Sequence, residues 1–587
     1  MATEPNEGPR SAPYSALEHI MCQLPVQQRM GNCSLACRSL QEAAVAVTGT
    51  VQVHNFSSQQ RADALCAWLH RHGSKAMAHL DLEGVWGFDH PSAVIRLPWQ
   101  QLLQLQSLRV RRLQLSMGRH SRTGCTTSSC SKQPASIAAE TAVAAAAAAA
   151  AAAAKLWRSL SALTRLTSLQ LSTFSTCSPT ATVRWTARQI VPLTSLRCLN
   201  LGFSGFGPHT YTSSGAPSAD LSAALGQLVQ LTALSLDSHL DGRALSTVSS
   251  LTQLQRLQLI DVGRVGSSEE PLKVQGFPSS LTHLRLLGCC IQAPDDGSSW
   301  QLPLLQELDM WDVQGFELAA IADTPQLRWV KMGGEEMSDL NMECLLGCLG
   351  SLQHLQHLEL HNMKQKASAA SFSELTASSS LTALLLLDCS IPAGAARHMF
   401  PPGRQLQQLQ QLQIEPSDEA FDDYVEGSQG ADTMQLQSLL LRSGDLQRLI
   451  SCCPNLQELS LVWPKDSSDA RVAGNDVRLL LQLKRLTSLS VGGPLWDNRA
   501  ATEVLARLTG LQELYVVGST ELSLPGVRQL TRLTALTTLC LSKCGVAFLC
   551  DMAGHDRPLS LKSQASPPDV WRQLQHKCDQ MAAMQRW

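Results

Sequence analysis

The hexapeptide Leu281-Thr282-His283-Leu284-Arg285-Leu286 indicates the class of fold, because its pattern, apolar-x-x-apolar-x-apolar, recurs along most of the 587-residue chain. Plain copies also start at Leu231 and Leu254, and others follow about 25 residues apart. These later copies start at Leu305, Leu327, Leu355, Leu381, Leu409, Leu436, Leu456, Leu486, Leu511 and Leu536. Upstream copies with looser spacing start at Met77, Val110, Leu166 and Leu196. A repeat of this length predicts stacked structural units rather than separate globular domains.

The spacing inside each copy predicts a short strand. The last two apolar positions alternate with other residues, so they lie on one face of an extended segment. One such strand cannot bury its leucines alone, whereas copies stacked ~4.8 Å apart form a continuous apolar seam. Each buried leucine then contributes roughly 1.5–3 kcal/mol. The segments between the strands, such as 445–450 and 502–508, are typical of helical or irregular returns.

This repeat resembles the leucine-rich repeat, and the resemblance covers about residues 77–545. It implies an α/β fold, a solenoid in which a curved parallel sheet is backed by helical or irregular returns. It also implies an Asn or Cys three residues after the last strand leucine, where the side chain bonds the backbone of the turn. Cys289, Cys389 and Cys544 occupy this position, whereas Val313 and Pro464 occupy it in other copies.

Segments of different composition interrupt and flank the repeat. Residues 116–161 are a low-complexity insertion, and the alanine run 144–154 predicts a helix because alanine has the highest helix propensity. We interpret this insertion as a neutral expansion, with a partner-binding helix as the alternative. The other predicted regions are a disordered N-terminus (1–10), a helical module (11–50), the first irregular repeats (51–115), the main array (162–545) and a C-terminal cap or tail (546–587).

The helical module has its own pattern. Apolar residues recur at helical spacing before Leu24-Pro25, and a second amphipathic helix is centred on Ala36-Cys37-Arg38. This order resembles an F-box, a short helical module that docks on a Skp-type adaptor and so on a cullin ubiquitin ligase. The resemblance implies the following adaptor-binding residues: Leu17, Ile20, Leu24, Pro25, Leu35, Cys37 and Leu40. The alternative is that both helices only cover the apolar seam of the first repeat.

The charge balance excludes some classes of partner. The chain has 47 Lys and Arg against 49 Asp and Glu, so its formal charge is −2. A nucleic-acid binder or a polybasic membrane binder needs surplus basic charge, so we expect neither kind of partner. The first ten residues are polar, no secretory apolar segment follows them, and the 19 cysteines include no CxxC pair. We therefore expect reduced thiols and a cytoplasmic or nuclear location.

Catalytic motifs are absent from the sequence. It contains no GxxxxGK, no GxGxxG after a strand, no HExxH and no GxSxG. His357 and His361 share one predicted strand, which places their Cα atoms ~13 Å apart, too far for one metal ion. We therefore expect no enzyme activity, no cofactor and no bound metal.

Strand parity predicts a site on the sheet. Positions two, four and six residues after the first leucine of a copy face away from the seam. The middle position alternates in charge along neighbouring copies, and these residues can pair laterally. Tryptophans, which are enriched at binding hot spots, also face outward there. We predict a partner-binding site on the concave face, made of Arg285, Glu307, Asp309, Trp311, Trp329, Lys331, His357 and Glu359. The alternative is that the charges only satisfy one another and the tryptophans only pack on neighbours.

These features favour a non-catalytic substrate-recognition subunit of a cullin-type (SCF) ubiquitin ligase. The module at 11–50 would bind the adaptor, and the repeats would bind an unidentified protein target. The alternative is a cytoskeletal or ciliary leucine-rich-repeat scaffold with no ligase link. A pathogen sensor is a third hypothesis, which ranks last because no nucleotide-binding module is visible.

Overall fold

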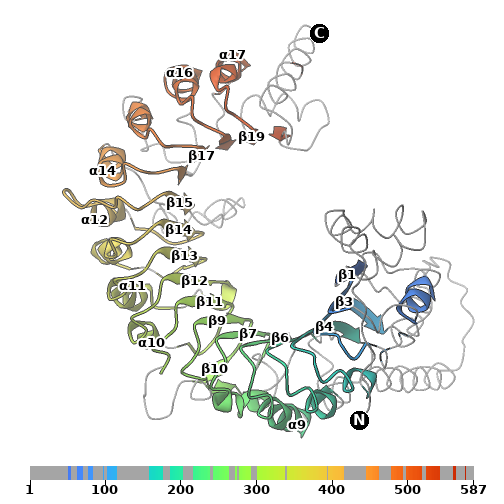
Figure 1. Cartoon of the computed structure of the whole chain (residues 1–587). Coiled ribbons are helices and arrows are strands. Elements are labelled where there is room, and N and C mark those ends of the chain that lie inside the picture. Colours follow the sequence, from blue (N-terminus) through green and yellow to red (C-terminus); the bar gives the residue numbers. More distant parts are fainter. Residues whose placement is uncertain are drawn as a thin grey trace, which may run out of the picture. The chain divides into compact units, whose positions relative to one another are not determined.

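The computed structural model shows short strands that alternate with helical returns (Figure 1). It describes residues 50–53, 63–70, 77–83, 97, 99, 102–115, 158–175, 186–202, 216–237, 242–262, 271–273, 277–292, 301–316, 318–337, 340–365, 367–392, 394–415, 444–461, 477–492, 498–517, 522, 524–542, 559–562 and 576. The adaptor-binding residues predicted between 17 and 40, and the alanine run, lie outside these ranges.

The chain divides into two compact units, and each is described by itself. Unit 1 comprises Met1–Leu281 and Gly288–Pro294. Its parallel sheet contains, in chain order, β1 (Thr50–Val53), β2 (His79–Glu83), β3 (Ser107–Leu115), β4 (Ser168–Ser175), β5 (Cys198–Gly202), β6 (Ala233–Asp237) and β7 (Arg256–Ile260). Its other elements are α9 (Ala216–Leu225), η3 (Gly242–Leu245), η4 (Val248–Ser250) and a parallel pair of β8 (Leu272–Lys273) with β10 (Ile291–Gln292).

Unit 2 comprises Thr282–Leu287 and Asp295–Trp587. Its strands pair parallel in chain order: β9 (His283–Leu287), β11 (Glu307–Trp311), β12 (Trp329–Gly333), β13 (His357–His361), β14 (Ala383–Leu387), β15 (Gln411–Glu415), β16 (Glu458–Leu461), β17 (Ser488–Gly492), β18 (Glu513–Val517) and β19 (Thr538–Ser542). A last strand, β20 (Leu559–Lys562), pairs antiparallel with β19 and covers that edge of the sheet.

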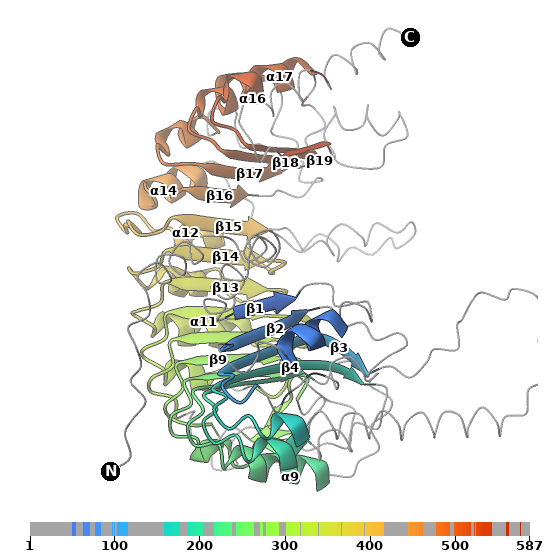
Figure 2. The same cartoon turned by 45° about the vertical axis from the view of Figure 1, so that its right-hand side comes forward.

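The returns of unit 2 lie along one side of these strands (Figures 1 and 2). They contain α10 (Ala319–Ala322), η6 (Glu335–Met337), α11 (Met342–Gly350), η7 (Ala370–Thr376), α12 (Ala395–Met399), α14 (Asp445–Cys452), η9 (Arg478–Gln482), α16 (Asn498–Glu503), η10 (Leu505–Arg507), α17 (Leu524–Gln529) and η11 (Leu530–Arg532). The helical returns expected at 445–450 and 502–508 are therefore present as α14 and as α16 with η10.

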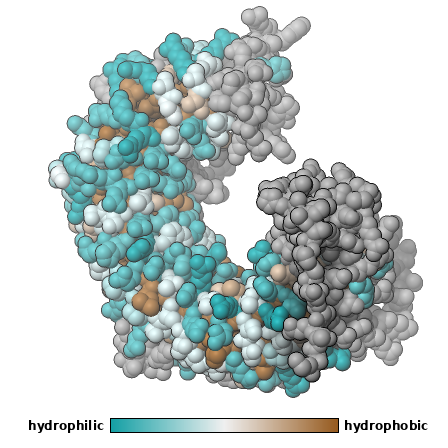
Figure 3. Space-filling view, viewed as in Figure 1, coloured by the Kyte–Doolittle hydropathy of each residue, from teal (hydrophilic) through white to brown (hydrophobic). Residues whose placement is uncertain are grey.

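The leucine seam forms the core of each repeat. In the repeat that contains β18, Leu511, Leu514 and Val516 are 0% exposed. A further leucine three residues before each copy, Leu508 in this case, joins the core. It also closes the turn, because its carbonyl accepts a hydrogen bond from the Leu511 amide at 3.0 Å. Figure 3 shows the result on the surface seen there, where apolar side chains form only small separate patches among hydrophilic ones.

A threonine after the first leucine links neighbouring repeats. The Gln356 carbonyl accepts hydrogen bonds from the Thr382 amide at 2.7 Å, the Thr382 hydroxyl at 2.8 Å and the Ala383 amide at 3.0 Å. Thr167, Thr232, Thr487 and Thr537 donate to the preceding repeat in the same way. The hydroxyl at this position therefore adds a third donor to a carbonyl that already accepts two backbone amides.

A left-handed residue follows many of the strands. The positive-φ residues at this position are Asp261, Gly288, Asp312, Gly334, Asn362 and Asp388. Asp, Asn and Gly are the residues that adopt this conformation at least cost. At Gly334 the requirement is stricter, because an added Cβ would lie 2.1 Å from Asp312 Oδ1.

The cysteine position implied by the leucine-rich-repeat resemblance is occupied as expected in two copies. The buried thiol of Cys389 donates to the Leu360 carbonyl at 3.4 Å, and that of Cys289 to the Leu259 carbonyl at 3.6 Å. Burial raises the pKa of Cys389 to about 12, so this thiol stays protonated and can donate. Val313 fills the same position with an apolar side chain that is 2% exposed.

Two predicted copies were wrong. The copy assigned to Val110 starts five residues earlier, at Leu105, because Leu105, Leu108 and Val110 occupy the three buried positions. The copy assigned to Leu436 does not supply a strand between β15 and β16, because those two strands pair directly. One repeat of the array therefore holds a long insertion, and the apolar pattern alone could not distinguish it from an extra strand.

None of the helices in the described part of the chain combines the length and the apolar character that crossing a bilayer requires.

Candidate functional site

The candidate site lies on β9 and β11–β14 of unit 2, on the sheet face turned away from the leucine seam. We call this the outward face; it comprises the residues two, four and six positions after the first leucine of each copy. On β13, Leu358 and Leu360 are 0% exposed, whereas His357, Glu359 and His361 are only half-buried. This alternation confirms the predicted parity.

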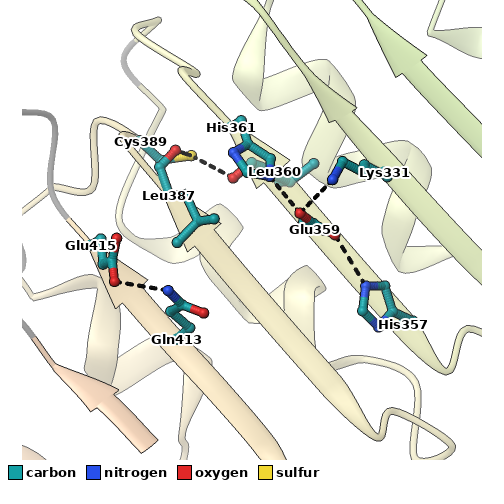
Figure 4. A network of polar contacts seen from close by, with 9 residues as sticks. All are labelled: Lys331, His357, Glu359, Leu360, His361, Leu387, Cys389, Gln413 and Glu415. Atoms are coloured by element: carbon teal, nitrogen blue, oxygen red, sulfur yellow. Dashed lines mark hydrogen bonds and ion pairs between the residues drawn. The ribbon is translucent and has the colours of Figure 1, made fainter. Parts of the chain in front are cut away.

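The middle row of the outward face is a ladder of alternating charges. Parallel pairing places Arg285, Asp309, Lys331 and Glu359 directly beside one another on successive strands. Arg285 Nε lies 3.0 Å from Asp309 Oδ2. Lys331 Nζ lies 2.8 Å from Glu359 Oε1, the pair that Figure 4 shows. The charges therefore pair two by two, and such partly exposed pairs contribute about 1 kcal/mol or less.

Asp309 is the strained member of this ladder. Its Oδ1 is buried without a hydrogen-bond partner in the described structure. Burial raises the pKa of Asp309, and this effect outweighs the opposing influence of Arg285 and Lys331. The carboxylate is thus held at some cost, which is typical of a group retained for something other than stability.

Glu359 is the hub of the polar network. Lys331 Nζ, His361 Nε2 and His357 Nε2 lie 2.8, 2.6 and 3.4 Å from its carboxylate oxygens, and Figure 4 shows all three converging on it. Burial alone would raise the pKa of Glu359, but the hydrogen bonds from Lys331 and the histidines lower it overall. The side chain is therefore ionised at neutral pH and fixes the orientation of three neighbours.

His357 lies in surroundings that disfavour its charged form. Burial lowers the pKa of His357, and Glu359 only partly offsets this effect. A neutral imidazole that donates Nε2–H to Glu359 keeps Nδ1 as an acceptor. Protonation of His357 would turn its Nδ1 into a donor, which would change the polarity of the outward face at this ring.

Each tryptophan packs on one of these histidines. The Trp329 ring stacks on His357 with centroids 5.2 Å apart and an interplanar angle of 17°. The Trp311 ring meets His361 edge to face, with centroids 5.0 Å apart. Lys331 Nζ lies 5.8 Å from the centroid of Trp311, within the range of a cation–π contact. The indoles are therefore held in place rather than left mobile.

Gly333 makes the Trp311–His361 contact possible. Trp311 is on β11 and His361 is on β13, so the two rings meet across β12. A Cβ at Gly333 would lie 2.5 Å from His361 Cβ and 3.0 Å from Trp311 Cζ3. Only glycine leaves enough room for this contact across a strand.

The rim of the site carries its most exposed charges. His283 Nε2 lies 3.2 Å from Glu307 Oε1, and His283 Nδ1 lies 2.7 Å from the hydroxyl of Thr282. The Glu307 side chain is 52% exposed and that of Arg285 is 50% exposed. Solvent screens these outer charges more strongly than the central Lys331–Glu359 pair.

The structure brings all eight predicted partner-binding residues together on four adjacent strands. The sequence prediction omitted His361 and Gly333 from the site. A signal for Gly333 was present, because it is a glycine at an outward position where neighbouring copies carry Trp311 and His361. Whether these residues bind a partner stays a prediction, as does the adaptor-binding role of the residues between 17 and 40.

Within the described ranges, no three His, Cys, Asp or Glu side chains form a group that could hold a metal ion. The thiols whose pKa departs from the usual value, those of Cys290, Cys348, Cys389, Cys452 and Cys453, all have it raised mainly by burial. A raised pKa disfavours the nucleophilic thiolate. The groups that the outward face itself presents are aromatic rings, imidazoles and paired charges.

The repeat, the parallel sheet and the buried cysteine position together define an α/β fold of the leucine-rich-repeat type. Scans against models of known families and against curated proteins find no match. Among solved structures, the chain is similar to a leucine-rich-repeat protein of Leptospira interrogans, with 15% identity over 90% of this chain and 99% of the other and a TM-score of 0.36. It is also similar to an internalin (inlF) of Listeria monocytogenes, with 13% identity over 88% and 96% of the two chains and a TM-score of 0.30.

Proposed function

We propose that this chain is a non-catalytic protein-interaction receptor that binds a partner protein on its outward face. The observation that carries this proposal is the Trp–His cluster, which we define as Trp311, Trp329, Lys331, His357, Glu359 and His361. Ring contacts and hydrogen bonds fix this cluster, so binding would cost little side-chain entropy. Fixed tryptophans with a charged rim have the composition of a binding hot spot.

The finer proposal is that the receptor serves a cullin-type ubiquitin ligase. It rests on the resemblance of residues 11–50 to an F-box, and the residues that would contact a Skp-type adaptor are Leu17, Ile20, Leu24, Pro25, Leu35, Cys37 and Leu40. The chain itself would perform no chemistry. It would raise the effective concentration of target lysines near the ligase.

Quantitative proximity cross-linking tests the receptor role. The intact chain is compared with the double variant Trp311→Ala/Trp329→Ala and with a control, Arg478→Gln/Arg499→Gln, which changes the pair of arginines that contact Glu503 of α16. We expect the tryptophan variant to lose a defined set of proteins that the control retains. Equal capture by all three chains would refute the proposed site.

Co-purification tests the ligase link separately. A Skp-type adaptor and a cullin are co-expressed with the full chain and with the variant Leu24→Asp/Leu35→Asp. We expect the full chain to retain the adaptor and the variant to lose it. Target capture on the outward face without adaptor capture would support the alternative, a leucine-rich-repeat scaffold of the cytoskeleton or cilium.

A further inference from the structure

Basic residues gather on the returns that lead into β16–β19. The described parts of these returns, 444–457, 477–487, 498–512, 522 and 524–537, contain eight Lys and Arg and two acids. The basic residues are Arg448, Arg478, Lys484, Arg485, Arg499, Arg507, Arg528 and Arg532, and the acids are Asp445 and Glu503. Asp445 is buried, so Glu503 is the one acid near the surface of these parts. This side of unit 2 is therefore strongly positive, although the whole chain has a formal charge of −2.

The returns around β11–β13 have the opposite charge balance. The described residues between β11 and β14 that lie outside the strands contain six acids against Arg328 and Lys364. These acids are Asp312, Asp323, Glu335, Glu336, Glu343 and Glu374. The positive region is therefore short, and a long polyanion that continued along the array would be repelled by these acids.

Four of the basic residues lie at one edge of three adjacent repeats. Lys484 and Arg485 come directly before Leu486 in the repeat of β17, and Arg507 and Arg532 each lie four residues before the first leucine of the next two repeats. Because β17, β18 and β19 pair in parallel register, this edge of the three repeats is continuous. The short helices η10 and η11, which carry Arg507 and Arg532, also contact each other. We call Lys484, Arg485, Arg507 and Arg532 the basic patch.

The basic patch is exposed and is not neutralised by its neighbours. All four residues are exposed, and within the described ranges no carboxylate pairs with any of them. Lys484 Nζ donates to the Leu481 carbonyl at 2.7 Å, which leaves its charge uncompensated. In contrast, Arg478 and Arg499 share the carboxylate of Glu503. The charge of the patch is therefore available to an incoming molecule.

The composition of the patch suits carboxylates. Three of its four residues are arginines, whose planar guanidinium can bind a carboxylate through two parallel hydrogen bonds. Arginine clusters are one of the recurring ways in which proteins recognise acidic segments. The patch covers two strand spacings, ~10 Å at the sheet, which an extended peptide spans with about three or four residues.

Other polyanions fit this surface less well. The described parts of these returns contain no aromatic side chain, so nucleic-acid bases would have no stacking platform. The exposed large apolar residues of the described chain, Leu103, Val229 and Leu304, lie elsewhere, so the patch has no apolar anchor for a membrane surface. A short acidic peptide needs neither feature.

We propose that the basic patch is a second docking surface, which binds a short acidic segment of a protein through ion pairs with its arginines. It is separate from the outward face and does not depend on the receptor function proposed there. Glu458 and Glu513 lie on the strands themselves. Their charge confines the acidic segment to the returns and keeps it off the outward face.

Fluorescence anisotropy with the full chain tests this proposal. The probe is a labelled decapeptide of alternating Glu and Ser, and its matched controls carry Gln or Lys in place of every Glu. At about 0.15 M salt we expect the Glu peptide to bind at least tenfold more tightly than both controls and to weaken as salt rises. No binding of the Glu peptide, or equal binding of the Gln peptide, would overturn the proposal.

A short DNA duplex and vesicles of phosphatidylcholine with phosphatidylserine test the other polyanions at the same salt concentration. We expect the Glu peptide to displace neither from the chain, because neither occupies the patch. Binding of the duplex or the vesicles that Arg485→Gln/Arg507→Gln abolishes would overturn the assignment of a protein segment.

Variants then locate the bound peptide. Arg485→Gln/Arg507→Gln should weaken binding of the Glu peptide at least fivefold, and the charge reversal Arg485→Glu/Arg507→Glu should abolish it. Arg328→Gln/Lys364→Gln removes the same charge outside the patch and should change binding less than twofold. Equal weakening by the two glutamine variants would contradict the assignment.

The tryptophan variant separates this proposal from the receptor function. Trp311→Ala/Trp329→Ala should bind the Glu peptide as tightly as the wild-type chain, even where it loses the partner of the outward face. A loss of the peptide in this variant would place the peptide on the outward face and overturn the basic patch.

Discussion

The outward positions of β9 and β11–β13 and those of β16–β19 share one scaffold but differ in chemistry. The first set carries two tryptophans, three histidines and paired charges. The second set consists largely of small residues, such as Ser488, Ser490 and Gly492 on β17. The buried leucines are alike in both, with Leu358 and Leu489 each 0% exposed. The fold therefore constrains the inward positions, whereas the outward positions are left for recognition.

Truncating a buried leucine should lower the free energy of unfolding by a similar amount in both regions. Leu358→Ala on β13 and Leu489→Ala on β17 should each lower the free energy of unfolding by about 2–5 kcal/mol, because both create a core cavity. Denaturant titration measures this loss. Ser490→Ala, an outward change next to Leu489, should stay within ~0.5 kcal/mol of wild type. A Leu489 variant as stable as the serine variant would show that the seam does not hold this part of the sheet together.

Removing an outward aromatic ring should weaken partner binding in the first region and not in the second. Trp311→Ala should weaken partner binding by about 30-fold, which corresponds to a hot spot of ~2 kcal/mol. Tyr515→Ala, which removes the outward aromatic ring of β18, should change it less than threefold. Surface plasmon resonance with the partner found by cross-linking measures both. Similar losses for the two variants would mean that the site extends over β16–β19.

A substitution at Gly333 tests the ring contact between Trp311 on β11 and His361 on β13. Gly333→Ala should lower the free energy of unfolding by about 1–3 kcal/mol, because its methyl group collides with His361 and Trp311. Gly347→Ala is the matched control. It lies in α11 with no heavy atom within 4 Å of the added Cβ, so it should stabilise the chain by roughly 0.5–1 kcal/mol. The account fails here if thermal or chemical unfolding shows both changes to be stabilising.

Breaking the Lys331–Glu359 pair should change the free energy of unfolding least of all these variants, and the change should depend on pH. The pKa of Glu359 is lowered below its usual 4.5 in the fold, so its contribution is present above that value and is lost as the pH falls through the lowered one. Lys331→Met should therefore cost up to about 1 kcal/mol near neutral pH, and this cost should fade under acid conditions.

Denaturant titration at several pH values measures the effect of Lys331→Met. Asp309, His357 and His361 also face this pair, so the comparison is the difference between wild type and variant at each pH. Ser490→Ala, in the middle row of β17, should show no such dependence. A cost for Lys331→Met that grows on acidification would contradict the assigned hydrogen bonds.

The sequence predicted most of the repeat and the alternation of its side chains. A period of two inside a repeat of about 25 residues is enough to assign the buried Leu358 and Leu360 and the outward Glu359. It also predicted that the middle-row charges can pair, since neighbouring copies share one register. These features depend only on spacing along the chain.

Other features depend on what lies beside a residue in space. The Trp311–His361 contact spans two strand spacings and needs the gap at Gly333, which no local pattern reveals. The copy at Leu436 has the right pattern, yet β15 pairs directly with β16, so the pattern alone does not place a strand in the sheet. The left-handed residues such as Asp388 likewise follow from the turn geometry after each strand.

Site-specific photo-cross-linking tests most directly whether recognition on the outward face is confined to β9–β14. A benzoylphenylalanine side chain replaces Leu387 on β14 in one chain and Val517 on β18 in another; both are outward, half-buried residues at the third position of their copies. The account predicts that the partner cross-links at position 387 and not at position 517. Cross-linking only at position 517 would contradict it.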